Sequence, residues 1–231
     1  MQIVTTHLNG AATIKPFAWS YSKLKNFEVC PKRHFHVDIA KDCNDDSSEA
    51  LLWGNAVHNA LARRLDKKTP LPEGMDKYET WCAKAESGGG DLAVELKLAI
   101  KKDFGPCDWF AKDTWFRGVA DVLKVFDRVA LAIDWKTGKI LEDSVQLALM
   151  SACIFAHYPS VEKLRTEFVW LQHDASSRCD FARTDMPDIW RSIWPRIEAL
   201  ESAHSSQLYP ATPGRLCKRW CPVTSCVHHG K

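Results

Sequence analysis

The spacing of apolar residues divides the chain into helical and extended segments. Apolar residues recur every three or four positions over 48–68 and 187–203, which predicts amphipathic helices there. Residues 143–157 are apolar nearly all round, which predicts a buried helix. Strict alternation of apolar residues from Leu92 to Ile100 predicts a half-buried strand that turns Glu95 to its polar face.

Shorter patterns complete the predicted order of elements. Helices are expected over 20–30 and 73–87, and strands over 164–172 and 179–184, while 104–112 is expected to be a loop. The chain then runs through helices, three antiparallel strands, a helix, a strand and a helix. This order predicts an α/β fold with a mixed sheet.

The central pattern is a β-hairpin between Arg117 and Lys139. Two runs rich in Val, Ile, Leu and Phe flank a short polar break at 127–128. A turn centred on that break places Asp121 opposite Asp134, and directly opposed Cβ atoms lie about 4.5–5.5 Å apart. Lys136 shares the face of Asp134 because side chains alternate along a strand. The hairpin is therefore expected to gather two carboxylates and an ammonium group on one surface.

This group of charges suggests a cation site. Two carboxylates at such a separation repel each other unless a cation lies between them. Paired oxygen ligands suit Mg²⁺, which keeps water and substrate phosphate in its other positions. Lys136 would then orient or activate the attacking water, or neutralise charge that develops on a phosphate. An ordinary cross-strand salt bridge on a surface hairpin is the alternative interpretation.

Length and composition are those of a soluble globular protein. The chain has 231 residues, of which 45% are hydrophobic and 26% charged, enough for one domain with a substantial core. We predict a single domain, 1–231. It divides into N-terminal helices (19–90), a core that carries the hairpin (91–172), a C-terminal strand and helix (173–210), and a cysteine-rich tail (211–231).

Charge and cysteine content restrict the environment. The net charge of +2 does not by itself indicate nucleic acid. No apolar run approaches the roughly 20 residues that span a membrane, so no membrane partner is expected. Nine cysteines, an odd number, are scattered over a chain too long to need disulfides, which favours a reducing compartment and a cytoplasmic location.

His58 lies on the apolar stripe of the helix predicted over 48–68, beside Gly54. A histidine on such a face is usually an ordinary core residue, but beside a carboxylate pair it becomes a candidate metal ligand.

Basic and aromatic residues are adjacent over 32–36. Such a segment can follow a phosphate backbone and stack on bases, although a solvated helix flank is the simpler interpretation.

The C-terminal tail suggests a second metal site. Three cysteines and two histidines fall within 13 residues: Cys217, Cys221, Cys226, His228 and His229. Three thiolates need a fourth ligand to close a tetrahedral site, and Cys30 or a tail histidine could supply it. Cys30 ends the first predicted helix before Pro31, where a returning C-terminal segment could dock. Incidental cysteines in an unstructured tail are the alternative.

Taken in order, these motifs resemble the PD-(D/E)XK nuclease superfamily, and most closely its RecB-like branch of phage exonucleases and CRISPR-adaptation nucleases. The matching pieces are Ser20-Tyr-Ser-Lys-Leu with Cys30-Pro, Trp53-Gly-Asn-Ala-Val-His58, Gly118-Val-Ala-Asp121, Ile133-Asp134-Trp-Lys136-Thr-Gly-Lys, Gln146-Leu-Ala-Leu-Met150 and the cysteine tail. Each piece alone is a weak signal, but the ordered set spans almost the whole chain.

The resemblance implies a restriction-endonuclease-like fold and a set of site residues. The implied metal ligands are His58, Asp121, Asp134 and the carbonyl of Trp135. Lys136 would serve the attacking water, and Gln146 would orient the site and the substrate. The implied cofactor is Mg²⁺ or Mn²⁺, and nitrogen from His58 favours Mn²⁺.

Two departures from the family pattern stand out. Met150 occupies a position that is often Tyr in the family. The tail cysteines have gaps of three and four residues, where iron–sulfur members usually have two and five. We expect Cys30, Cys217, Cys221 and Cys226 to hold a [4Fe–4S] cluster that clips the chain ends together, with zinc bound through His228 or His229 as the alternative.

The expected function is a metal-dependent DNA exonuclease in recombination, repair or replication. Its partners would be DNA, single-stranded or with free ends, and a recombination or replication protein. If the chain is phage-encoded, its location would be the host cytoplasm. A structure-specific endonuclease and a non-catalytic DNA-binding subunit with the same fold are the alternatives. An intact acidic pair with its lysine argues against the non-catalytic subunit.

Overall fold

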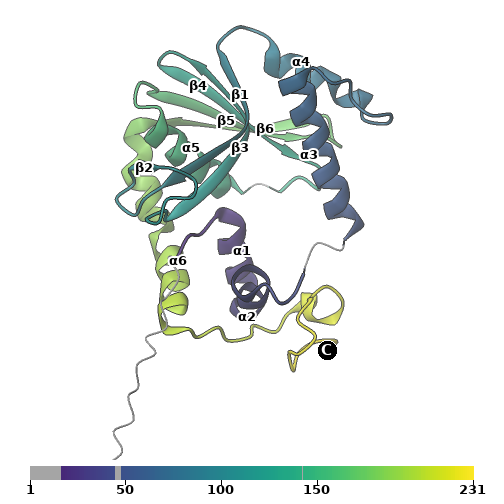
Figure 1. Cartoon of the computed structure of the whole chain (residues 1–231), viewed down its shortest axis with the longest axis vertical. Coiled ribbons are helices and arrows are strands. Elements are labelled where there is room, and N and C mark those ends of the chain that lie inside the picture. The colour runs from purple at the N-terminus through teal and green to yellow at the C-terminus, as the bar shows by residue number, and fades with distance from the viewer. Residues whose placement is uncertain (1–16, 45–47, 142) are drawn as a thin grey trace, which may run out of the picture.

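The computed structural model describes residues 17–44, 48–141 and 143–231. In this part of the chain six strands form one sheet in the order β2-β1-β3-β4-β5-β6 (Figure 1). The strands are β1 (Asp91–Ile100), β2 (Pro106–Cys107), β3 (Phe116–Phe126), β4 (Val129–Lys136), β5 (Lys163–Trp170) and β6 (Ala175–Ala182). Only the β4–β5 pair is parallel among these strands, so the predicted mixed sheet is confirmed.

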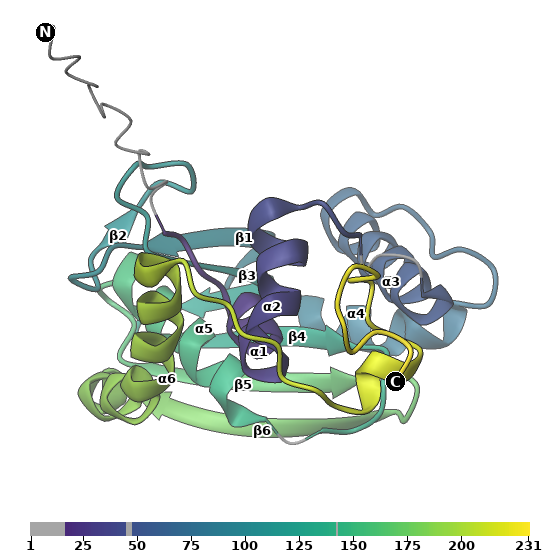
Figure 2. The same ribbon diagram turned by 90° about the horizontal axis from the view of Figure 1, so that it is seen from below.

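Helices cover both faces of the sheet (Figures 1 and 2). The α-helices are α1 (Tyr21–Val29), α2 (Pro31–His34), α3 (Glu49–Lys67), α4 (Glu79–Glu86), α5 (Ser144–His157) and α6 (Met186–Ser206). Short elements are the π-helix η1 (Phe35–Ala40) and the 3₁₀ turns η2 (Asp76–Tyr78), η3 (Arg183–Asp185) and η4 (Arg215–Lys218). The predicted α/β fold with a mixed sheet and flanking helices is thus confirmed.

The central hairpin has the predicted register. Phe126 pairs with Val129 and Val122 pairs with Ile133. Asp127, in the turn, has a left-handed backbone with φ of 57°. One further step of the same register places Asp121 opposite Asp134.

Two apolar cores lie on opposite faces of the sheet. The larger core joins α1, α5 and α6 to the sheet through residues such as Leu24, Leu149 and Ile197. The smaller core joins α3 and α4 to the other face through Leu61, Trp81 and neighbouring residues. Because each face is covered by its own helices, side chains at the end of β4 can be reached by helices from both sides.

Capping residues fix where the two helices α3 and α5 begin. Ser48 caps α3 by accepting a hydrogen bond from the backbone of Leu51 at 3.2 Å. Asp143 caps α5 by accepting from the backbone of Val145 at 3.1 Å. The Asp143 carboxylate also accepts a hydrogen bond from the Tyr21 hydroxyl, which ties the start of α5 to α1.

Several predicted boundaries were wrong. The helix expected over 73–87 is shorter, with η2 followed by α4. The loop expected over 104–112 contains β2, a two-residue strand on the edge of the sheet beside β1. Residues 1–18, which lack clear periodicity and are expected to form a loose lead-in, lie mostly outside the described residues. Trp19, just after it, is fully buried and pairs with the start of β3.

No described helix is long and apolar enough to cross a membrane.

Candidate active site

A cleft of about 1020 Å³ opens where α3 passes the ends of β3 and β4. Its lining includes His58, Glu95, Asp121, Asp134, Trp135, Lys136 and Gln146. Gly54 of α3 allows a close approach at its rim, because a Cβ there would lie 3.0 Å from Thr137 Oγ1. The cleft thus brings together all the residues predicted for the hydrolytic site.

The two hairpin aspartates are almost fully buried. Asp121 is 7% exposed and Asp134 is 5% exposed. Asp121 Oδ2 accepts a hydrogen bond from the backbone N–H of Trp135 at 2.7 Å, so it is fixed across the hairpin. Asp134 points toward α5, where it meets polar side chains.

A chain of hydrogen bonds holds Asp134, Lys136 and Gln146 together. Gln146 Nε2 donates to Asp134 Oδ1 at 2.6 Å, and Lys136 Nζ donates to Gln146 Oε1 at 2.9 Å. Lys136 Nζ also lies 2.7 Å from Asp134 Oδ2. That oxygen nevertheless accepts no hydrogen bond of good geometry from the described residues, because the ammonium is close but poorly aligned.

Burial dominates the electrostatics of Asp134. Loss of solvent raises the pKa of Asp134 to about 6, although the nearby Lys136 ammonium opposes this change. The Asp121 carboxylate raises the pKa of Asp134 further. A buried, partly unsatisfied carboxylate beside a second carboxylate is a place where a cation is favourable.

His58 reaches the same cleft from α3. Its Nδ1 lies 3.4 Å from Asp121 Oδ1, and its side chain is 32% exposed. Burial disfavours the imidazolium, but the Asp121 carboxylate outweighs it and raises the pKa of His58. His58 is therefore neither a plain core histidine nor fully solvated.

Glu95 is a site residue that the sequence reasoning missed. The ligand atoms of His58, Glu95 and Asp121 all lie within 4.8 Å of one another. Glu95 is exposed at the cleft, but partial loss of solvent raises its pKa and the Asp121 carboxylate raises it further. The alternation along β1 had placed Glu95 on the strand's polar face, away from any site.

A backbone distortion explains that error. Glu95 has φ of 52°, a left-handed conformation that is rare for a residue inside a strand. Val94 before it packs in the core of α3 and α4, whereas Leu96 after it packs in the core of α5 and α6. The apolar residues of β1 therefore change faces at Glu95, and no feature of the alternation predicts the change.

Two further predicted positions line the cleft in different ways. The Trp135 ring is 1% exposed and packs in the core of α3 and α4, which leaves its backbone as the part available to the site. Met150, where the family often has Tyr, is 6% exposed and lines the cleft from α5. Met150 therefore offers an apolar contact in place of a hydroxyl.

The cleft continues into a surface with cations and a tryptophan. Lys23, Trp109 and Arg117 line it beyond the carboxylates. The Arg117 guanidinium lies 5.5 Å from the centroid of the Trp109 ring, and Lys97 Nζ lies 5.8 Å from it. This group has no signature in the sequence, because its members come from α1, a loop and two strands.

The basic and aromatic segment over 32–36 has a structural role instead. His34 is 1% exposed and pairs with Asp38 at 2.8 Å. The Phe35 ring packs on Tyr209, with centroids 5.0 Å apart. Neither proposed interpretation, a track for a phosphate backbone or a solvated flank, describes these two residues.

The four predicted cysteine ligands line one small cavity. Cys30 faces Cys217, Cys221 and Cys226 there, and Thr212 N–H donates to Cys30 Sγ at 3.4 Å. His228 and His229 line the same cavity. Among the described residues, two groups of three or more His, Cys, Asp or Glu have ligand atoms within 4.8 Å, and neither includes these cysteines.

The donors that line this cleft fit a divalent cation. Its donors are imidazole nitrogen and carboxylate oxygens, which suit Mn²⁺ and Mg²⁺. The partly unsatisfied Asp134 Oδ2 and the close group of His58, Glu95 and Asp121 are the features that a cation would stabilise.

Part of the chain matches a known family, and the fold resembles a solved structure. Residues 18–112 match the family model of the PD-(D/E)XK nuclease superfamily, a segment that includes His58 and ends before Asp121. No curated protein matches the chain. A solved structure described as a "putative exonuclease" from Eubacterium rectale is 13% identical, with a TM-score of 0.55 over 91% of this chain and 90% of the other. The structure of SSO0001 is 14% identical, with a TM-score of 0.46 over 91% of this chain and 86% of the other.

Proposed function

We propose, from the premise that this chain is a member of the PD-(D/E)XK nuclease superfamily, that it is a divalent-metal-dependent DNA exonuclease. The observation that carries the proposal is a single cleft that holds two groups of polar side chains. One is the hydrogen-bonded group of Asp134, Lys136 and Gln146, and the other is the group of His58, Glu95 and Asp121. Superfamily membership supports nuclease chemistry. The preference for DNA ends and a role in recombination, repair or replication are the finer parts of the proposal.

Each side chain has a distinct role in this proposal. A divalent cation, when bound, supplies Lewis acidity toward the scissile phosphate. Asp121 and Asp134 would hold it with His58 and the backbone of Trp135, and we add Glu95 as a ligand on the basis of its position. Asp121 is held in place by the Trp135 N–H, so one of its oxygens is already committed and the other faces His58.

Lys136 is the candidate for handling the attacking water. Its Nζ is shared between Asp134 and Gln146, which fixes the ammonium at the floor of the cleft. An ammonium held there can orient a water or stabilise negative charge on a phosphate oxygen. Gln146 positions both charged partners at once, and this explains a glutamine in the first turn of an otherwise apolar helix.

The cleft supports a single strand of DNA better than an undistorted duplex. Trp109 offers a ring on which a base can stack, and Arg117 and Lys23 offer charge to the phosphates. Both features are independent of base sequence. A structure-specific endonuclease could use the same surface, so the choice between the two depends on the substrates cleaved.

The decisive assay uses end-labelled linear and circular DNA, each single- and double-stranded, with Mg²⁺ or Mn²⁺. An exonuclease degrades linear DNA from its ends and leaves covalently closed circles intact, whereas an endonuclease cuts the circles. A non-catalytic subunit binds DNA and cuts none of these substrates. Loss of all activity with EDTA is expected, and activity that survives full chelation would refute a metal-dependent mechanism.

Variants connect the activity to the cleft. Asp134→Ala and Lys136→Ala should stay folded and bind DNA, yet lose cleavage by several orders of magnitude. Asp66→Ala and Lys67→Ala, at exposed positions on α3, are matched controls and should cleave as the wild type does. Wild-type cleavage by a folded Asp134→Ala protein would refute the assignment.

We also propose that Cys30, Cys217, Cys221 and Cys226 hold a [4Fe–4S] cluster. Donor chemistry carries this proposal, because four thiolates from both chain ends line one cavity. A tetrahedral zinc ion holds its sulfurs about 3.8 Å apart, closer than these cysteines come as a group. The enclosed volume of about 10 Å³ is that of a single water, so either group requires the cysteines to move.

Metal analysis distinguishes a cluster from zinc. Protein purified without oxygen should be brown and contain iron and sulfide, and Cys30→Ala should lose both. A colourless protein with one zinc that Cys30→Ala retains would refute the cluster. It would favour a zinc site formed within the tail through His228 or His229.

A further inference from the structure

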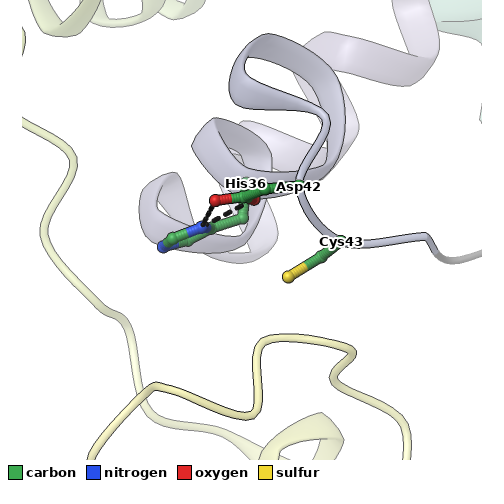
Figure 3. Close-up of side chains that lie close together, drawn as sticks. All are labelled: His36, Asp42 and Cys43. Atoms are coloured by element: carbon green, nitrogen blue, oxygen red, sulfur yellow. Dashed lines mark hydrogen bonds and ion pairs between the residues drawn. The ribbon is translucent and has the colours of Figure 1, made fainter.

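A second group of potential metal ligands lies outside both sites described above. His36, Asp42 and Cys43 have ligand atoms that all lie within 4.8 Å of one another (Figure 3). His36 Nδ1 lies 2.9 Å from Asp42 Oδ1 and 3.1 Å from Asp42 Oδ2. None of the three lines the hydrolytic cleft or the cavity of Cys30 and the tail cysteines.

The backbone brings these residues together at the end of η1. Lys41 takes a left-handed conformation, with φ of 55° and ψ of 34°, and closes the π-helix by donating its N–H to the carbonyl of His36. The next residue, Asp42, donates its own N–H to that carbonyl at 3.2 Å. The chain therefore reverses over His36 and places Asp42 and Cys43 beside its ring, as Figure 3 shows.

The group also lies against the C-terminal tail. Figure 3 shows Cys43 pointing toward the tail backbone. A site here would lie between the N-terminal helices and the tail.

The three donors suit one class of metal ion. Zinc accepts imidazole nitrogen, carboxylate oxygen and thiolate sulfur, and three protein ligands leave one position of its tetrahedron for water or a further donor. Mg²⁺ is a poor match because thiolate is a soft ligand. The donor set thus differs from that of the hydrolytic cleft, where nitrogen and oxygen predominate.

We propose that His36, Asp42 and Cys43 bind one zinc ion, separately from the hydrolytic site and from the four-cysteine site. The ion would fix the turn over 41–43 onto η1. Its role would be structural, since the group lies outside the hydrolytic cleft.

Cobalt is the probe that separates this site from the hydrolytic one. Co²⁺ bound to a thiolate absorbs in the near ultraviolet, whereas Co²⁺ held by His58 and carboxylates does not. Reduced, metal-free, full-length protein is titrated with Co²⁺, and bound Co²⁺ is then displaced with Zn²⁺. The same titration of the triple variant Cys217→Ser/Cys221→Ser/Cys226→Ser, which removes all three thiols of the tail, isolates the contribution of the proposed site.

In this triple tail variant, one equivalent of thiolate-bound Co²⁺ should remain. Adding Cys43→Ser should abolish that absorption, and adding His36→Ala should weaken binding by at least about tenfold. Cys107→Ser and His173→Ala are matched controls at a partly buried and an exposed position, and should change nothing. Asp42→Asn, whose side chain is 55% exposed, tests the site with little risk to folding and should also weaken binding.

Two results would overturn the proposal. One is that the His36→Ala and Asp42→Asn variants bind Co²⁺ as tightly as their parent protein. The other is that the triple tail variant shows no thiolate-bound Co²⁺ at all, since Cys43 would then bind no metal of its own.

Discussion

Gln146 offers the sharpest test of how the cleft is held together. It joins Asp134 to Lys136 through two hydrogen bonds of 2.6 and 2.9 Å, each with a charged partner. Replacement by leucine keeps a side chain of similar size in α5 but removes both bonds. Asp134 then loses a donor and the Lys136 ammonium loses an acceptor that positions it.

The size of the effect follows from these two bonds. A hydrogen bond to a charged group contributes about 1.5–3 kcal/mol. Gln146 is only half-buried, so water can replace part of each bond, and we expect a total cost of about 1.5–3 kcal/mol for the pair. Each 1.4 kcal/mol corresponds to about a tenfold change in rate, so kcat should fall about 10- to 100-fold.

Single-turnover cleavage of end-labelled linear DNA with Mg²⁺ measures this effect, with DNA affinity measured separately in Ca²⁺. Gln146→Leu should lower the cleavage rate and change DNA affinity little, because the residue positions charged groups on the cleft floor. Gln172→Leu, an exposed glutamine after β5, is the matched control. Wild-type cleavage by Gln146→Leu would refute the idea that this hydrogen-bonded chain positions Lys136.

Further predictions concern the other residues around the cleft. Glu95→Gln should weaken Mn²⁺ binding to DNA-free protein by about tenfold in calorimetry, whereas exposed Glu73→Gln should not, and equal affinities would remove Glu95 from the ligand set. Mn²⁺ should support cleavage at least as well as Mg²⁺, and His58→Ala should reduce that preference because it removes the nitrogen donor. Asp143→Ala should lower the free energy of unfolding by about 1 kcal/mol, and Asp143→Asn by less, because Asn still caps α5. Burial opposes ionisation of Asp143, but the hydrogen bonds from Tyr21 and from the backbone of Val145 lower its pKa. The stabilisation of the folded state by this carboxylate is therefore present above the unfolded-state pKa and is lost as the pH falls through the folded-state pKa. Urea unfolding of the wild type and Asp143→Ala at neutral and acidic pH measures this stabilisation. A loss of unfolding free energy that is the same at both pH values would contradict the predicted pH dependence.

Local rules explain what could be predicted from the sequence. The hairpin register follows from the position of its turn, because every step away from 127–128 fixes the next pair. The placement of His58 follows from the helical period, although Leu51 on the same predicted stripe is 40% exposed and lies outside the core. The shared cavity of Cys30 and the tail cysteines agrees with the expectation that the C-terminal segment returns to the end of α1.

The errors arise where distant residues decide the outcome. Basic and aromatic residues over 32–36 suggested a surface segment, but His34 is buried by Asp38 and by packing that involves Tyr209 from the far end of the chain. The edge strand β2 is only two residues long, too short to give an alternating pattern. Such elements exist because of their tertiary partners, which the local sequence does not specify.

Glu95 shows why the site itself requires an irregular strand. The register of β1 with β3 places Val94 opposite Val122 and Leu96 opposite Ala120, so Glu95 lies opposite Asp121. Continued across the hairpin, the same row leads to Asp134. Three carboxylates thus stand in one row across three adjacent strands.

In a regular sheet all three would point to one face, and a helix on the other face could not reach them. In this sheet, the core-facing residues of β1 and β3 change from one face of the sheet to the other at this row. Ala120 packs in the core of α5 and α6, whereas Val122, two residues later, packs in the core of α3 and α4. The left-handed backbone of Glu95 produces the matching switch in β1. As a result Asp121 meets His58 of α3 while Asp134 meets Gln146 of α5, so helices on opposite faces of the sheet contribute to one cleft. The strained backbone of Glu95 therefore explains the missed ligand, and the change of faces along its row, in β3 as well as β1, explains the two-sided construction of the site.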